Sequence, residues 1–359
     1  MKGDFMMKRM MKAMTLLMDL QLFATQTTLL NASGNSLNAE MKTFYDLTLI
    51  DLVGPRLVHD QFGQKRPIPK NGGKTIEFRQ FTPLAKATGA LTEGVTPAGN
   101  KLDVTAKTSV VKQYGDFIVI SDVLDLTTID PVLVESVKLL GNQSGQSLDT
   151  VTRNVLNAGT NVSYCPKIAA NGTKTEVTSR AGLDTTCKLT VDMVQRTVAK
   201  LRAQNAPTID GCYVAIIHPY VAYDLMRDPE WIDAHKYAQP ENLYAGEIGK
   251  VAGVRFVETS EAKIWRDDTC PAHSGATPAY YGVFSTLFLG QNAYGVTEVT
   301  GGGLKTIIKQ MGSGGTEDPL DQRASAGWKA LKTAEILVEN YMVRVESMSP
   351  VYSADVAAN

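Results

Sequence analysis

Cysteine is scarce in this sequence, with four residues among 359. They are Cys165, Cys187, Cys212 and Cys270. No two of them stand at C-x-x-C spacing, which is typical of structural zinc sites and redox dithiols. A chain of this length can bury a hydrophobic core that needs no disulfide staples. We therefore predict four free thiols in a reducing cytoplasm, with no metal and no other cofactor.

An excess of charge of either sign is also missing. Lysine and arginine number 36 and aspartate and glutamate 37, which gives a net charge of −1. A dedicated nucleic-acid-binding protein normally carries a basic excess, so this balance argues against that class. A net charge near zero also removes a barrier to self-association.

Long hydrophobic runs are absent. No stretch approaches the roughly 20 consecutive apolar residues that a membrane-spanning helix needs, so we expect no membrane partner. Hydrophobic residues make up 43% of the chain and charged residues 20%, which is ordinary for globular proteins. Wholesale disorder is therefore excluded.

The phosphate-binding and dinucleotide-binding motifs are incomplete. Residues 71–75, Asn-Gly-Gly-Lys-Thr, resemble the end of a phosphate-binding loop, but Ile68 stands where that motif requires its first glycine. The lysine and threonine also open a predicted strand, whereas the motif must open a helix. Residues 301–303 are three glycines without the spacing of a dinucleotide-binding loop. Both segments are predicted to be turns.

Motifs for nucleophilic and metal-assisted catalysis are lacking as well. There is no G-x-S-x-G, no H-E-x-x-H and no calcium-loop pattern. An enzyme would need a cleft in residues 206–310 that unites His218 or His235 with acidic side chains. We expect His218, which stands between a buried strand and a helix start, to hydrogen-bond that turn instead. The favoured interpretation is therefore not an enzyme, and the enzyme is kept as an alternative.

Residues 1–23 form a leader of uncertain status. Basic residues precede the apolar run Ala13–Leu17, as in a signal peptide, but Asp19 and Gln21 interrupt the pattern and no cleavage site follows. One hypothesis is that the natural start is Met18. A second alternative function, a secreted surface-layer protein that self-assembles, would require the leader to be a true signal.

Residues 24–73 are predicted to form an N-terminal arm and a helix. Residues 24–38 are small and polar, which is typical of a mobile arm. Apolar residues at helical spacing from Met41 to Leu52 then predict a helix that ends before Pro55.

Residues 74–122 contain the most unusual feature of the sequence. A strand is predicted from Lys74 to Phe81 and a second extended stretch from Asp103 to Ile120. The connection at residues 82–102 is far longer than an ordinary hairpin loop, and structureless loops of that size are usually functional. Its only sizeable apolar residues are Leu84, Leu91, Val95 and Leu102. Because so few apolar groups cannot bury this segment, we expect it to project or to rest on another surface.

The remainder predicts an α+β chain. Asp130-Pro131 opens a long helix that runs to Leu156, with an apolar stripe at Leu133, Val137 and Leu140. Thr190 caps a second helix, and Asp228 to Trp231 is expected to end a third helix with an aromatic anchor. Other strands and short helices are expected at 160–189, Cys212–Ile217, Tyr220–Asp228, Gly253–Glu258, Tyr280–Phe288, Lys305–Ile308 and Trp328–Ser347.

The order of these segments resembles one protein family. The chain is similar to the major capsid proteins of tailed phages, specifically the phage N-four type, which have the Hong Kong ninety-seven type capsid fold. The segments that carry the resemblance are Met18–Ala24, Gly73–Phe78 with Leu91–Gly94, His218–Pro219, Gly246–Gly249, Gly253–Phe256 and Asp318–Arg323. Each is short, and their order and spacing together make the resemblance specific.

The resemblance implies a domain organisation. It comprises an N-terminal arm, an extended β-hairpin loop, a peripheral domain with a long spine helix, and an axial α/β domain. The corresponding boundaries are 1–23 for the leader, 24–73 for the arm and helix, 74–122 for the extended loop, 123–205 and 311–350 for the peripheral domain, and 206–310 for the axial domain.

The resemblance also implies a function and partners. Copies of the chain would form pentamers and hexamers that close into an icosahedral phage head, assembled in the cytoplasm of the host bacterium. Scaffold and portal proteins would be partners, and the enclosed double-stranded DNA would be contacted non-specifically. In the extended loop, the residues expected to contact neighbouring subunits are Lys86, Leu91, Glu93, Val95 and Lys101.

Overall fold

The computed structural model describes residues 58–359, apart from 97–98, 129–131, 237–248, 274–278 and 314–317. Four sequence predictions lie outside the described residues. They are the leader at 1–23, the arm at 24–38, the helix from Met41 to Leu52, and the helix start at Asp130-Pro131.

The first of two large sheets is built around one long strand, β15 (Arg323–Ile336). One edge of β15 pairs antiparallel with β4 (Lys112–Ser121) over ten successive residue pairs. The other edge pairs first with β14 (Lys305–Lys309) and then with β13 (Tyr294–Glu298), which carries the short parallel strand β1 (Gln64–Lys65).

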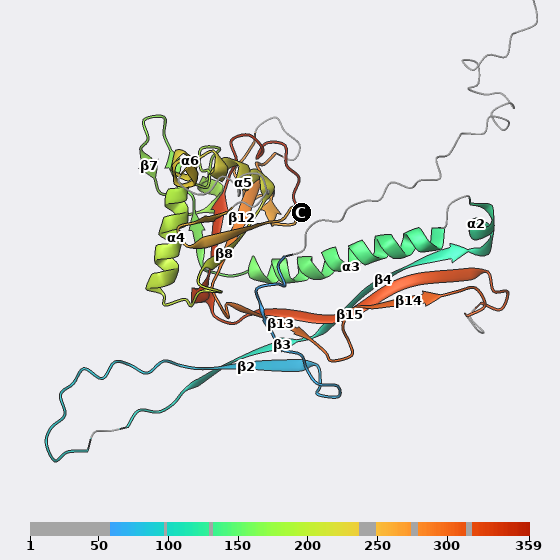
Figure 1. Ribbon diagram of the computed structural model, residues 1–359, viewed down its shortest axis with the longest axis horizontal. Helices are drawn as coiled ribbons and strands as arrows, with labels where there is room; N and C mark the ends of the chain where they lie inside the picture. Colours follow the sequence, from blue (N-terminus) through green and yellow to red (C-terminus); the bar gives the residue numbers. More distant parts are fainter. Residues whose placement is uncertain (1–57, 97–98, 129–131, 237–248, 274–278, 314–317) are drawn as a thin grey trace, which may run out of the picture. The chain divides into compact units, whose positions relative to one another are not determined.

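The long helix α3 (Val132–Leu156) lies along β4 and β15 (Figure 1). Leu140 of the helix joins Ala326, Trp328 and Ala330 of the strand in one buried cluster. These strand positions alternate, as expected for one face of a sheet. Since alanine is small, the helix can approach the strand closely. The predicted helix is confirmed as far as it is described, and Leu133 and Val137 of the predicted stripe pack against the same cluster.

The second large sheet holds the main apolar core. Its order is β5 (Val162–Tyr164), β16 (Met342–Ser347), β12 (Val283–Leu289), β8 (Tyr213–Ile217), β10 (Val254–Glu258) and β9 (Lys250–Val251), with β11 (Ile264–Trp265) on β12. Every residue of β8 and β12 is buried, which explains their nearly continuous apolar sequences. The predicted strands at these positions are confirmed.

Helices pack against this core. They are α4 (Val191–Ala203), α5 (Pro219–Met226) and α6 (Pro229–Lys236). The Thr190 side chain caps α4 by accepting from the backbone N–H of Met193 at 3.4 Å, which confirms the predicted helix start. The four cysteines are free, as predicted, and all four are buried.

Several elements differ from the sequence prediction. The helix expected at Tyr220–Asp228 ends at Met226, close to its predicted end, but a further helix, α6, follows it unpredicted. Asp228 Oδ1 accepts from the backbone N–H of Glu230 at 3.2 Å at the start of α6. Trp231 is buried, as expected of an anchor. The stretch expected from Trp328 to Ser347 divides into β15 and β16, with the short 3-10 helix Glu339–Tyr341 between them. Strand β13 was not predicted.

Sheet membership does not follow the expected domain boundaries everywhere. Strands β13 and β14 fall within residues 206–310 yet pair with β15. Strands β5 and β16 fall within the expected peripheral segments yet belong to the second sheet. The sheet that a strand joins depends on its pairing with strands far away in the sequence. A local sequence pattern contains no information on that pairing.

A buried polar cluster attaches the start of the described chain to the first sheet and its helix. His59 Nδ1 lies 2.6 Å from Asp149 Oδ2, and the His59 backbone N–H donates to Asp149 Oδ1 at 2.9 Å. Lys332 of β15 pairs with Asp60 and donates to the Leu148 carbonyl at 2.8 Å. Because His59, Asp149 and Lys332 are buried, each needs its partner to avoid a desolvation cost.

Candidate assembly interface

The predicted extended loop begins as a regular hairpin. Strands β2 (Thr75–Phe81) and β3 (Val104–Val110) pair antiparallel from Thr75 opposite Val110 to Phe81 opposite Val104. The glycine-rich segment before β2 therefore enters a strand, which confirms that it is no phosphate-binding loop. Gly73 has φ of +85°, a left-handed conformation that glycine adopts without strain.

The second strand of the expected hairpin is divided in two. The stretch expected from Asp103 to Ile120 breaks at Val111 into β3 and β4. Strand β3 stays with β2, whereas β4 joins β15 in the first sheet. The extended loop therefore continues directly into the strand that packs beneath α3.

The connection beyond the paired strands buries none of its described residues. All of residues 82–102 that the structure describes are exposed, and Leu91 and Val95 expose 77% and 62% of their surface. Leu84 and Leu102 are also more than half exposed. The prediction that this segment cannot bury itself is confirmed for the isolated chain.

All five predicted subunit-contact residues lie in this exposed connection, at Lys86, Leu91, Glu93, Val95 and Lys101. Within the described part of the chain, the three charged ones form no ion pair with another side chain. Their charges therefore face solvent in one copy. Their role as contacts stays a prediction.

The base of the hairpin touches the rest of the chain at a few points. Phe78, which is 7% exposed, lies over Gly295, where an added Cβ would stand 2.8 Å from the phenyl Cζ. Ser109 Oγ hydrogen-bonds Thr333 Oγ1 at 2.8 Å. Phe78 and Ser109 are the residues of the β2–β3 pair that are buried.

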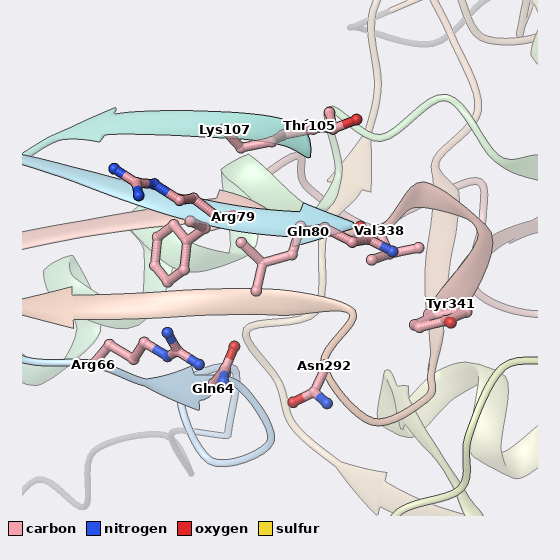
Figure 2. A pocket seen from close by; sticks show the side chains of 11 residues that line it. Gln64, Arg66, Arg79, Gln80, Thr105, Lys107, Asn292, Val338 and Tyr341 are labelled. Carbon is pink, nitrogen blue, oxygen red and sulfur yellow. The ribbon is translucent and has the colours of Figure 1, made fainter. Parts of the chain in front are cut away.

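A pocket of about 240 Å³ opens at this base. Figure 2 shows its side chains gathered from β1 and the residue after it, from β2 and β3, and from the segments that precede β13 and follow β15. Three cations, Arg66, Arg79 and Lys107, line it together with amide groups and the apolar side chains of Phe78 and Leu337. We call this the basic pocket. Its chemistry suits a ligand with both a carboxylate and an apolar group.

Another exposed apolar surface lies where β4 ends. The helix α2 (Asp122–Thr127) follows β4 and is capped by Ser121, whose Oγ accepts from the backbone N–H of Leu124 at 3.3 Å. Leu126 is 83% exposed and Phe117 68%. Phe117 and Ile307 both lie opposite Gly327, so they share the sheet face turned away from α3. Apolar groups this exposed in a single copy are candidates for contact with another protein.

No catalytic arrangement is evident among the residues that the structure describes. His218 Nδ1 accepts from the backbone N–H of Tyr220 at 3.2 Å, which confirms its predicted structural role. Burial lowers the pKa of His218 to about 4. The His235 side chain lies outside the described residues, and the His273 ring stacks on Tyr281.

Within the residues that the structure describes, no group of three or more histidine, cysteine or acidic side chains could hold a metal ion. No helix in the same residues has the length and apolar character needed to cross a membrane.

The phage capsid protein family provides a match to the chain. Its sequence pattern matches residues 132–311, from the first described turn of α3 to just beyond β14, which is about half of the chain. The chain belongs to the phage capsid protein family. It is a major capsid protein of a tailed-phage icosahedral head, its location is the virion, and it is a structural protein rather than an enzyme. The enzyme and surface-layer alternatives are therefore set aside.

Solved structures share the fold of this capsid protein. The capsid of cyanophage P-SCSP1u superposes with a TM-score of 0.63 at 14% identity, covering 91% of this chain and all of its own. The capsid of Ralstonia phage GP4 gives 0.63 at 14% identity, with 93% and 100% covered. The capsid of cyanophage Pam1 gives 0.62 at 13% identity, with 90% and 100% covered. No match was found among curated proteins.

These comparisons confirm the predicted fold and the predicted membership among phage capsid proteins. The chain has the predicted α+β tailed-phage capsid fold, of the Hong Kong ninety-seven type. At identities this low, such structural similarity establishes the fold alone, and the family match supplies the function.

Proposed function

We propose that this capsid protein forms its shell by laying the loop at residues 82–102 on a neighbouring copy. The exposure of the whole described loop carries the proposal. Exposed apolar side chains such as Leu91 and Val95 contribute no burial free energy to a single copy. On burial in an interface, each would contribute roughly 25 cal/mol per Å² of apolar surface. A long, thinly attached loop supplies reach, and contacts to several neighbours add avidity to modest individual affinities.

Within the loop, the proposed contacts are Lys86, Leu91, Glu93, Val95 and Lys101. The two apolar residues would be buried on assembly, and the three charged ones would pair with groups on the neighbour. The proposal rests on their exposure and on the absence of ion pairs to them within the described chain.

The wider architecture is part of the same proposal. The arm at 24–73, the loop at 74–122, the peripheral segments 123–205 and 311–350, and the axial segment 206–310 would form pentamers and hexamers around double-stranded DNA. The capsid would be of the N-four type, with scaffold and portal proteins as partners. The near-neutral chain supports a wall that encloses DNA without binding it tightly.

Deleting residues 85–101 tests the role of the loop. The full chain and the deletion variant are expressed in parallel and examined by size-exclusion chromatography and negative-stain electron microscopy. We expect shells, rings or tubes from the full chain. The variant should keep its thermal unfolding midpoint, because the deleted residues bury nothing, but it should remain as free subunits.

A matched control separates reach from side-chain contact. Replacing residues 85–101 with glycine and serine at equal length keeps the reach and removes the proposed contacts. Normal shells from the deletion variant would show that the loop is no assembly element. If the glycine-serine variant forms normal shells and the deletion variant does not, the length of the loop is sufficient for assembly and the five named side chains are not needed.

A further inference from the structure

Charge is unevenly distributed along this nearly neutral chain. Residues 64–112, which include the hairpin, contain nine lysines and arginines and three acidic residues. The next residues, 113–137, contain five acidic residues and no lysine or arginine. A strongly basic and a strongly acidic segment therefore follow one another, which suggests that each has an oppositely charged partner.

The basic pocket gathers part of the positive charge around an apolar floor. Arg66 and Lys107 form no ion pair within the described residues, and Arg79 pairs only with the exposed Glu77, at 2.8 Å. Phe78 and Leu337 supply apolar surface in the same pocket. The pocket thus offers uncompensated cations next to a place for an apolar side chain.

The helix α2 presents the complementary groups. Leu126 is its most exposed apolar side chain, and Val123 is also more than half exposed. Asp122 and Asp125 flank these residues, and neither forms an ion pair within the described part of the chain. Among the described residues, the Asp122 carboxylate accepts a hydrogen bond from the backbone N–H of Val123, at 2.8 Å.

The two surfaces stand at opposite ends of strand β15. Ser121, the cap of α2, pairs with Arg323 at the start of that strand, whereas Leu337 in the basic pocket follows its last residue, Ile336. At roughly 3.3 Å per residue, the strand separates them by about 45 Å. Because the strand is held on both edges, one copy cannot place its own α2 in its own pocket.

We propose that α2 of one copy docks in the basic pocket of a second copy. Leu126 packs on Phe78 and Leu337, while Asp122 and Asp125 face Arg66 and Lys107. This inference rests on the proposed function, since it names the partner surface at the base of the hairpin. A contact between different surfaces is head-to-tail, and repeated head-to-tail contacts close into a ring when the rotation allows.

Charge reversal in the full chain tests the pairing. Lys107→Glu and Asp125→Lys each place like charges together, which weakens the interface between two copies. Each single variant should lose about tenfold or more of its assembled material, measured by size-exclusion chromatography and electron microscopy. The double variant, which restores opposite charges, should regain assembly.

Two matched controls make the loss specific. Lys65→Glu reverses an exposed lysine beside the pocket that does not line it, and Asp268→Lys reverses an exposed aspartate far from α2 in sequence. Both should assemble like the unsubstituted chain. If they fail as severely as the pocket variants, net charge rather than pairing is responsible and the proposal is overturned.

Cross-linking in the unsubstituted chain gives an independent measurement. A carbodiimide joins a carboxylate to a nearby lysine without a spacer, so assembled material should yield a peptide linking Asp122 or Asp125 to Lys107 of another copy. Mixing isotopically labelled and unlabelled protein before assembly identifies links between copies. Assembled shells without any such peptide and without a defect in the single variants would overturn the proposal.

The outcomes also separate this inference from the proposed function. Failure of the unsubstituted chain to assemble under any condition contradicts the proposed function itself. Normal assembly of Lys107→Glu and Asp125→Lys overturns the docking proposal and leaves the function intact. Normal assembly of Lys107→Glu with reduced binding of a fluorescent DNA duplex would instead assign the pocket to packaged DNA.

Discussion

At the scale of single residues, small side chains decide how closely the elements of this protein approach one another. Gly327 lies beneath Phe117, where an added Cβ would stand 2.8 Å from the phenylalanine Cβ. Because Gly295 has no Cβ, the Phe78 ring at the base of the hairpin can pack directly against its backbone. Neither glycine has a positive φ. Glycine is needed at both positions because a neighbouring phenylalanine occupies the space that a Cβ would take.

We predict that Gly295→Ala loosens the hairpin. The added methyl group overpacks the contact with Phe78, which typically costs about 1–3 kcal/mol. Amide hydrogen exchange in β2 and β3 should accelerate, while exchange in β8 and β12 should not change. Gly89→Ala is the control, since nothing lies within 4 Å of its Cβ position. Unchanged exchange in β2 and β3 of Gly295→Ala would refute this prediction.

At the scale of elements, helix caps and buried strands were predictable and strand partners were not. Thr190 and His218 cap α4 and α5 through contacts within three residues, so a local pattern is sufficient to find them. The separation of β3 from β4 depends instead on β15, more than 200 residues away in sequence. Local periodicity describes both strands as extended and carries no information on which sheet each joins.

We predict that His218 makes the protein sensitive to acid. Burial holds the folded-state pKa at about 4, below the ordinary value of 6.5. The unfolded state therefore binds the proton first, and stability present above pH 6.5 falls as the pH drops from 6.5 toward 4, by at most about 3 kcal/mol.

His218→Asn tests this dependence on pH. Asparagine can still cap α5 but does not titrate. Urea unfolding at pH 7 and pH 4.5 should show a smaller loss of stability for the variant than for the unsubstituted chain. Equal losses in the two proteins would assign the acid sensitivity to other groups.

At the scale of the whole molecule, this capsid protein exposes apolar side chains that a monomeric protein would be expected to bury. The loop at 82–102, the outer face at Phe117 and the helix α2 all present apolar side chains to solvent. These exposed groups belong to none of the three buried apolar clusters of the described chain, so the cores of a single copy do not depend on covering them.

We predict that assembly weakens as salt increases. Screening shortens the Debye length from about 10 Å at 0.1 M to about 3 Å at 1 M, which reduces attraction between the basic pocket and α2. The fraction of assembled protein, measured by light scattering, should fall over this range. Assembly that grows stronger with salt would indicate that apolar contacts dominate and that the charge pairing is unimportant.

The sequence by itself determined the capsid fold, the long helix, the caps and the loop that could not bury itself. These follow from local periodicity, capping residues and composition, or from short segments that resemble the family. Only the tertiary structure decided that β4 belongs to the sheet of β15, that three cations converge at the hairpin base, and that α2 lies at the opposite end of β15. Those facts depend on pairing between residues far apart in the chain, and such pairing is fixed by packing.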